Sequence, residues 1–319
     1  MRKLIIICMV LLFLVGCGQK QTETKGTGSQ FVGGTNGLSL EFVEGTPPPE
    51  VLDQNQPFGI SLKLSNLGEY SISDVSKATV KLSGFDPADF GVTQAELQQQ
   101  APEELRGAQK DIEGNLVQGT VVTMDFPAGG GSFQHQQTIA GSVTYNVRAE
   151  VCYDYGTTAN AKLCVLKDLL GTQGKQGELC EVNEAKTVDQ SGSPVQVTGF
   201  TESVSSSNKV AFVFKVSHTQ SGTVHELGSS CDPDFNKKNK VHVKVDTGMT
   251  DGLTCSGLQN GATSGSLFEG DATLLNGERE IRCTQTINNP TDLEKLVRID
   301  LTYEYDQFIS KDLEVKHLG

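Results

Sequence analysis

The stretch VRIDLTYEY, residues 297–305, alternates between apolar and polar side chains. Its apolar positions are Val297, Ile299, Leu301, Tyr303 and Tyr305. Strict alternation is typical of a β-strand that buries one face, so these side chains are expected to point into a core. The stretch 143–155 has the same pattern and places Tyr153 and Tyr155 on its apolar face. Similar short runs, separated by Gly, Asn, Ser and Asp, predict an all-β protein of antiparallel strands.

An internal repeat organises these runs, because segments of the first half match segments of the second by identity or in outline. The matched pairs are VRAEVCYDY 147–155 with VRIDLTYEY 297–305, ISLKLSN 60–66 with FVFKVSH 212–218, VKL 80–82 with VKV 243–245, and LSLEF 38–42 with VQVTGF 195–200. Self-similarity of this kind is the signature of duplication. We therefore predict two domains, residues 31–190 and 191–319.

About seven short strands in each copy, with turn residues between them, are typical of a β-sandwich. The chain resembles the broad Ig-like or CARDB-like class of prokaryotic surface domains, some of which occur in archaeal exported proteins. That resemblance implies two tandem antiparallel Ig-like sandwiches. The chain has no Trp, so the buried Trp of antibody domains is absent. A polar, Gln- and Glu-rich segment near 92–112 is expected to be a helical or loop insertion in the first copy.

The N-terminal residues have the layout of an export signal. Arg2 and Lys3 precede an apolar run from Leu4 to Val15, and LVGC at 14–17 resembles the lipobox of bacterial lipoproteins. The run is shorter than the roughly 20 residues that span a bilayer and fits the 7–15 residues of a signal peptide. We expect removal of the signal helix 1–16 and a lipid on Cys17. The protein would then sit on the extracytoplasmic face of the cell membrane, with 17–30 as a flexible tether.

The net charge excludes some partners. The full chain carries a formal charge of −13, and loss of Arg2 and Lys3 with the signal gives −13 − 2 = −15. Such a charge argues against nucleic acid and against binding to anionic lipid head groups.

Six cysteines remain after Cys8 leaves with the signal and Cys17 takes a lipid. They are Cys152, Cys164, Cys180, Cys231, Cys255 and Cys283. An even number in an exported protein predicts disulfides. No C-x₂-C pair is present, so a structural zinc site is not favoured.

The repeat suggests how the cysteines pair. The second copy has Thr302 and Glu314 where the first has Cys152 and Cys164, which is expected if those two cysteines are bonded to each other. A hairpin centred on Thr158 would bring them face to face. Cys255 with Cys283 is the next predicted pair. Cys180 with Cys231 remains, and Cys164 with Cys180 is an equally good local alternative.

No catalytic motif is evident. The sequence lacks G-x-S-x-G, and the spacings of His218, His225 and His242 match no zinc motif. Asp232 and Asp234 suit a turn, and calcium there would rest on analogy alone. A glycine triplet at 129–131 is expected to form an exposed loop tip that offers Phe126 and Phe133 as a contact surface. We predict no catalysis and no cofactor.

These observations favour a structural or adhesive surface lipoprotein that contacts a surface protein or glycan. The alternative is a ligand- or metal-binding lipoprotein that feeds a membrane complex, which requires a closed pocket at the domain junction. An exported enzyme would require carboxylates or histidines that only the fold brings together.

Overall fold

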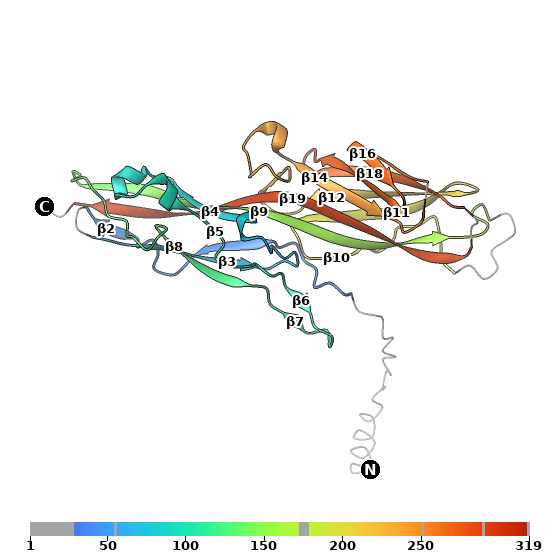
Figure 1. The fold of residues 1–319 in the computed structure, drawn as a ribbon, viewed down its shortest axis with the longest axis horizontal. Coiled ribbons are helices and arrows are strands. Elements are labelled where there is room, and N and C mark those ends of the chain that lie inside the picture. Colours follow the sequence, from blue (N-terminus) through green and yellow to red (C-terminus); the bar gives the residue numbers. More distant parts are fainter. Residues whose placement is uncertain (1–28, 54–55, 172–178, 251, 289–290, 318–319) are drawn as a thin grey trace, which may run out of the picture.

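The chain forms an elongated all-β rod in the computed structural model (Figure 1). The structure describes residues 29–53, 56–171, 179–250, 252–288 and 291–317. Within these ranges the only helical segments are 3₁₀ turns of three or four residues, and no helix is long and apolar enough to cross a membrane. The predicted signal helix, Cys17 and nearly all of the predicted tether lie outside the described residues.

The strands form two short sheets on one long sheet. A ten-stranded sheet contains β2 (Glu50–Leu52), β4 (Ala78–Ser83), β5 (Gln98–Gln100), β9 (Ser142–Val165), β10 (Asp189–Gln190), β13 (Thr223–His225), β14 (Lys240–Asp246), β16 (Gln259–Ser264), β17 (Leu267–Thr273) and β19 (Leu293–Lys316). A three-stranded sheet contains β1 (Leu38–Phe42), β3 (Ile60–Asn66) and β8 (Val121–Phe126). A four-stranded sheet contains β11 (Val195–Ser206), β12 (Lys209–His218), β15 (Leu253–Ser256) and β18 (Glu278–Thr286). A separate hairpin joins β6 (Gln109–Lys110) and β7 (Leu116–Val117).

Strands β9 and β19 run the length of the rod. Each has 24 residues, and they pair antiparallel from Ser142 with Lys316 to Val165 with Leu293. The predicted hairpin centred on Thr158 is therefore wrong, because Thr158 lies within β9 opposite Asp300. Residues 156–165 continue the β9 strand and offer no Asn-Gly or Gly-Gly pair of the kind that closes a two-residue hairpin.

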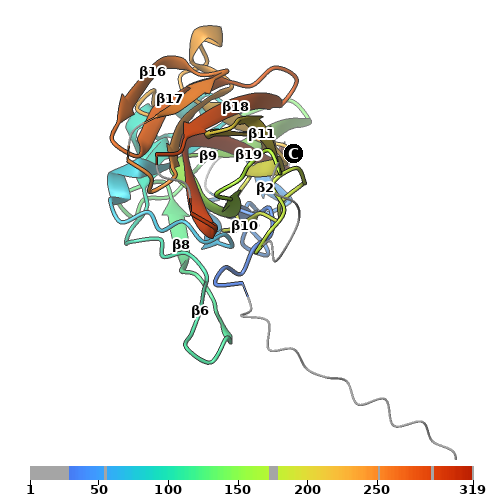
Figure 2. The same ribbon diagram turned by 90° about the vertical axis from the view of Figure 1, so that its right-hand side faces the viewer.

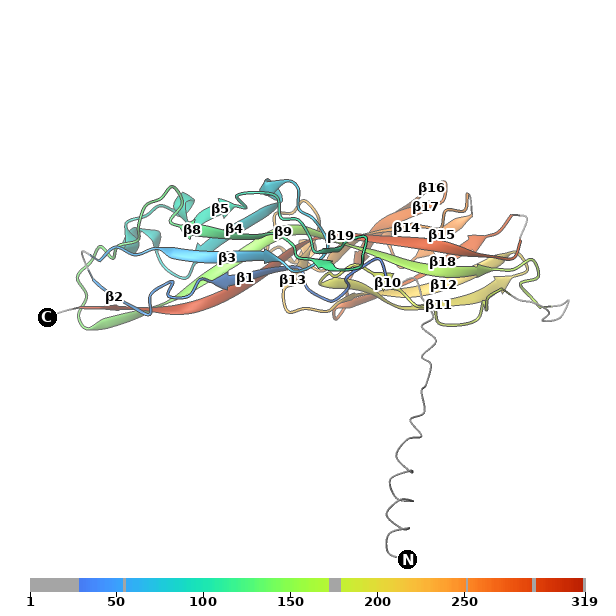
Figure 3. The ribbon, with the colours of Figure 1, turned by 90° about the horizontal axis from the view of Figure 1, so that it is seen from below.

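The short sheets pack on opposite ends of the long sheet and define two lobes (Figure 3), which lie one behind the other when the rod is viewed along its length (Figure 2). The three-stranded sheet packs where the first half of β9 pairs with the second half of β19. The four-stranded sheet packs where the other two halves pair. The second half of β9 thus lies in the lobe of the second repeat, and the second half of β19 lies in the lobe of the first repeat. The long sheet does not divide at residue 190, although all but one of its pairings are antiparallel, as predicted.

The centre of the rod has pseudo-twofold symmetry. With the offset of 150, Asp154 and Glu304 are equivalent residues (154 + 150 = 304), and they lie directly opposite each other. On the inner face, Tyr155 pairs with Tyr303 and Tyr153 with Tyr305, and all four are fully buried as predicted. The repeats are interlocked about this point.

The hydrogen bonds of the tyrosines follow the same symmetry. The hydroxyl of Tyr153 accepts from the backbone N–H of Leu38, and that of Tyr303 accepts from Val195. The hydroxyl of Tyr155 donates to Asn66 Oδ1, while that of Tyr305 bonds His218 Nε2. Leu38 and Val195 begin matched segments, and Asn66 and His218 end another matched pair. Equivalent tyrosines therefore make equivalent contacts, which supports the repeat.

The segment near 92–112 contains short turns and strands. It includes the 3₁₀ turn η4 (Gln94–Leu97), with Thr93 and Glu96 in a capping box, followed directly by β5. Leu97 and Leu105 are buried, so the segment is anchored to the first lobe. Because β5 pairs with β4, the segment also extends the long sheet.

The six cysteines form three disulfides, but two of the predicted pairings are wrong. Cys255 is bonded to Cys283 as predicted, across β15 and β18. Cys164 is bonded to Cys180, which was the local alternative. Cys152 is bonded to Cys231, so neither Cys152–Cys164 nor Cys180–Cys231 forms. The physical reason is the continuous β9, which carries Cys152 and Cys164 into different lobes.

Candidate functional site: a groove at the waist

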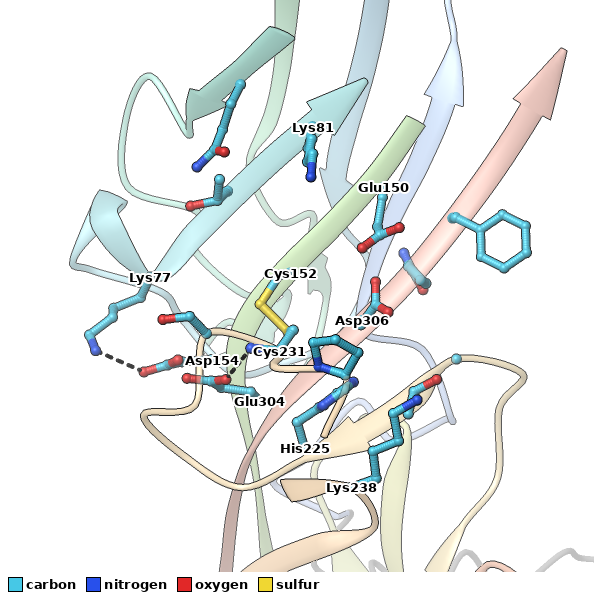
Figure 4. Close-up of a pocket in the computed structure, with 18 of the residues that line it drawn as sticks. Lys77, Lys81, Glu150, Cys152, Asp154, His225, Cys231, Lys238, Glu304 and Asp306 are labelled. Carbon is cyan, nitrogen blue, oxygen red and sulfur yellow. Dashed lines mark hydrogen bonds and ion pairs between the residues drawn. A yellow bond between two sulfur atoms is a disulfide. The ribbon is translucent and has the colours of Figure 1, made fainter. Parts of the chain in front are cut away.

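A groove of about 1020 Å³ lies on the outer face of the long sheet, where the lobes meet (Figure 4). We call it the waist groove. Its floor consists of outward-facing residues in cross-strand rows. One row is Gln98, Lys81, Glu150 and Phe308, the next is Gln100, Thr79, Cys152 and Asp306, and the third is Asp154 and Glu304. Alternation along the strands explains why these side chains face away from the tyrosine core.

The wall of the groove beside this floor is the β12–β14 connection, residues 219–239. The disulfide between Cys152 and Cys231 ties this connection to β9. Glu304 holds it from β19: its carboxylate accepts hydrogen bonds from the backbone N–H groups of Gly228 and Cys231, at 2.8 and 2.7 Å, and from the Ser229 hydroxyl at 2.9 Å. Glu304 is only 3% exposed. The wall is thus fixed by a covalent bond and by a fully satisfied buried carboxylate.

Three buried polar atoms in the groove lack partners. Among the described residues, only Arg148 Nε, His225 Nε2 and Asp306 Oδ1 are solvent-shielded side-chain N or O atoms without a hydrogen bond. All three residues line the waist groove. A buried polar atom without a partner costs roughly 1–3 kcal/mol. These three atoms are therefore polar groups of the groove whose hydrogen-bonding capacity the fold leaves unused.

The neighbourhoods of these atoms differ. His225 is 1% exposed, and its Nδ1 lies 3.1 Å from the carbonyl oxygen of Asp232, so Nε2 is its free nitrogen. Burial lowers the pKa of His225 and favours the neutral ring. Arg148 donates from an Nη atom to Glu150 at 2.8 Å, and its guanidinium carbon lies 3.6 Å from the ring centroid of Phe308.

The groove is electrically balanced. Its lining holds four cations, Lys77, Lys81, Arg148 and Lys238, and four carboxylates, Glu150, Asp154, Glu304 and Asp306. Burial, and then the nearby Glu150 carboxylate, raises the pKa of Asp306 to about 6. Burial also raises the pKa of Asp154, which lies 3.7 Å from Lys77. The groove can therefore offer both hydrogen-bond donors and acceptors without a large net charge.

The histidines considered for zinc do not converge. His218 bonds Tyr305 in the core, His225 lines the groove, and His242 bonds Asp271 at 2.9 Å on β17. Within the described ranges the sole cluster with metal-ligand spacing is Cys152, Cys231 and Glu304. Its two sulfur atoms form a disulfide and so provide no thiolate. The residues therefore do not fit a metal in this form.

The other residues singled out in the sequence have structural roles. Asp232 and Asp234 accept hydrogen bonds from backbone N–H groups two residues further on, as turn residues do. Phe126 and Phe133 are 2% and 0% exposed, so the predicted aromatic loop tip is wrong. Phe133 instead packs against Phe58 and Phe85 in the first lobe. The glycine triplet between them carries no aromatic contact surface.

The sequence reasoning missed the waist groove, although one signal was available. The offset between matched segments is 152 for 60–66 with 212–218, rises to 163 for 80–82 with 243–245, and returns to 150 for 147–155 with 297–305. The second copy therefore has 11 extra residues before 243, and the first has 13 extra residues before 147. These insertions hold the groove wall at 219–239 and strand β5 at its other side.

Comparison with known proteins gives no family. No family model and no curated protein matches the chain. One solved structure, the secreted serine protease VesC from Vibrio cholerae, aligns over 89% of this chain and 52% of that protein, at 10% identity and a TM-score of 0.19. The chain thus spans about half the length of that protein. A TM-score this low carries no argument about fold or activity.

Proposed function

We propose that this chain is a lipid-anchored, extracytoplasmic binding protein made of two Ig-like sandwich lobes, and that the waist groove holds its ligand. The lipobox at 14–17 supports the anchor on Cys17, and the three disulfides fit an oxidising, extracytoplasmic location. The two short sheets packed on one long sheet support the sandwich assignment. The alternative of a ligand-binding lipoprotein required a closed pocket at the domain junction; the structure has an open groove there, and we propose that this groove takes that role.

One observation carries the binding role. All three partnerless buried polar atoms of the described residues, on Arg148, His225 and Asp306, line one groove. Folding gains nothing from such atoms, whereas a polar ligand can bond all three. They come from β9, β13 and β19, so the site depends on the assembled waist and not on one loop.

The test is the binding of the purified full chain to isolated cell envelopes of its own source. We expect saturable binding by the wild type and at least a tenfold weaker binding by the double variant His225→Ala/Asp306→Asn. The control is His242→Ala/Asp271→Asn, which removes the same residue types from the outer face of β14 and β17. Equal binding by all three proteins would reject the groove as the site.

Anchoring is tested separately by intact-mass spectrometry of protein extracted from membranes. The expected mass begins at Cys17, carries a lipid, and gains about 6 Da on reduction of the three disulfides. A chain that keeps residues 1–16 would reject the lipoprotein assignment but would leave the groove assignment in place.

A further inference from the structure

The waist groove continues into a second hollow. That hollow, of about 270 Å³, shares Ser221, Gln307 and Phe308 with the waist groove. It is bounded on its far side by residues 36–40 at the start of the first lobe and by Pro194 at the start of the second. The two hollows therefore adjoin at the waist, with Phe308 lining both, and we call them together the trough. A trough of this form suits an extended ligand better than a compact one.

Phe308 provides an apolar platform in the middle of the trough. It is 56% exposed, although it lies among polar side chains. The guanidinium of Arg148 lies 3.6 Å from its ring centroid and holds the ring in place. Opposite Phe308 in the strand register is Glu150, which also bonds Arg148. An exposed aromatic ring with polar groups at its edge matches a sugar ring, which has apolar C–H faces and a rim of hydroxyls.

The partnerless atoms call for a ligand group that both donates and accepts. Arg148 Nε can only donate and the ionised carboxylate of Asp306 can only accept, while neutral His225, whose Nδ1–H faces the Asp232 carbonyl oxygen, accepts at Nε2. A hydroxyl has one donor hydrogen and two acceptor lone pairs, so adjacent hydroxyls on one molecule satisfy all three. A carboxylate or a phosphate would leave Asp306 unsatisfied and would repel it.

The charge balance of the waist groove also limits the chemical class of the ligand. The four cations and four carboxylates of the waist groove cancel formally, so the groove has no excess charge that attracts a polyanion. The charge of −13 on the whole chain opposes acidic polysaccharides as well. A neutral hydroxylated chain has no such penalty.

The central floor strands leave no room for an added peptide strand, because β4, β9 and residues 304–306 of β19 are flanked on both sides. Free sheet edges lie only at the two ends of the floor rows, where β5 pairs with β4 alone and residues 307–308 pair with β9 alone. From the trough, the aromatic platform and the three partnerless atoms, we propose that the ligand is a neutral glycan chain that crosses the waist over Phe308. This proposal rests on the binding role proposed above.

The experiment uses the full chain and titration calorimetry with neutral glucan, mannan and chitin oligosaccharides of one, three and six units. We expect at least one series to bind, with affinity that rises from one to six units. Phe308→Ala and Asp306→Asn should each weaken that binding at least tenfold, while Phe308→Tyr, which keeps the ring, should bind within threefold of the wild type. Phe235→Ala is the matched control, because Phe235 is 83% exposed and lines neither hollow.

The outcomes separate the two proposals. If no neutral oligosaccharide binds but envelope binding persists and is lost in His225→Ala/Asp306→Asn, the glycan assignment is wrong and the binding role holds. The same conclusion follows if protease treatment of the envelopes abolishes binding. The trough is rejected as the binding site if sugar binding does not change in Phe308→Ala. It is also rejected if one sugar unit binds as tightly as six. Unchanged thermal unfolding of Phe308→Ala would show that its loss of binding is not a loss of fold.

Discussion

The substitution Asp306→Asn should stabilise the unliganded protein while it weakens ligand binding. Asp306 has a pKa of 3.8 when solvated and about 6 in the fold, because burial and Glu150 disfavour its charged form. The folded protein therefore holds this proton more tightly than the unfolded chain does. The stability that protonated Asp306 contributes to the folded protein is therefore lost as the pH rises from about 4 through 6. The shift of 6 − 3.8 = 2.2 sets an upper bound of about 3 kcal/mol above pH 7, and solvent screening of this partly exposed carboxylate reduces the free energy to about 1–2 kcal/mol.

Asn has no charge to bury, so the variant escapes this cost. It keeps a polar oxygen at the same place, which retains part of the roughly 1–3 kcal/mol penalty of a partnerless group. We expect Asp306→Asn to be more stable than the wild type by about 1–2 kcal/mol at pH 7.5, and the difference to vanish near pH 4. Acids that do not interact with Asp306 titrate equally in both proteins and cancel in the difference.

The assay is guanidinium unfolding of both proteins, with disulfides intact, at pH 4, 5.5 and 7.5. The control is Asp111→Asn. The Asp111 carboxylate accepts hydrogen bonds from Asn115 and from the backbone N–H of Glu113, and these bonds lower its pKa. Because the pKa of Asp111 is lowered in the fold, its charged form contributes stability at high pH. The Asp111→Asn variant should therefore lose stability relative to the wild type as the pH rises. A difference between wild type and Asp306→Asn that stays constant across pH would refute the assignment of Asp306 as a buried, unsatisfied carboxylate.

Three further predictions test the fold. Burial raises the pKa of Glu202 from 4.5 to about 7, so the wild type should lose about 3 kcal/mol between pH 4.5 and pH 8, and Glu202→Gln should flatten that loss in denaturant titrations. The double variant Cys152→Ser/Cys231→Ser should lose about 4.5 kcal/mol by the loop-entropy model, given the separation of 79 residues, and should speed amide exchange in the groove wall. A methyl group on Gly68 would collide with the Tyr155 hydroxyl, so Gly68→Ala should lower the unfolding temperature by several degrees; an unchanged temperature would contradict the packing at the waist.

Alternation identified the strands and their faces well. The four inward tyrosines were predictable because burial of one face imposes a period of two on the sequence, whatever the strand pairs with. The repeat was visible for the same reason. What alternation does not specify is the partner of each strand: residues 156–165 have the same pattern in a hairpin with 147–155 as in a long strand against β19. The sequence therefore left the exchange of strand segments between lobes undetermined.

The disulfide errors and the missed groove follow from that exchange. A hairpin at Thr158 would have put Cys152 opposite Cys164, whereas the extended β9 separates them and leaves Cys152 next to the β12–β14 connection. The groove residues lie in segments far apart in the chain, at 76–81, 98–100, 148–154, 221–238 and 304–308. No local motif joins them, so only the assembled long sheet brings them together.

The asymmetry of the repeat explains why a groove forms on a symmetric floor. Asp154 and Glu304 mark the pseudo-twofold centre, and a strictly repeated chain would treat their surroundings alike. The connection between the matched strands is 11 residues in the first copy, from 67 to 77, but 21 in the second, from 219 to 239. The longer connection carries Cys231 and His225 and closes over one side of the floor, while the insertion near 92–112 adds β5 on the other. Each copy has thus added one segment beside the shared centre. The longer connection also completes the core, since the Gly222 N–H donates to the Tyr305 hydroxyl and β13 pairs with β19. What the two segments share beyond these contacts is their place around the waist groove, where we propose that the ligand binds.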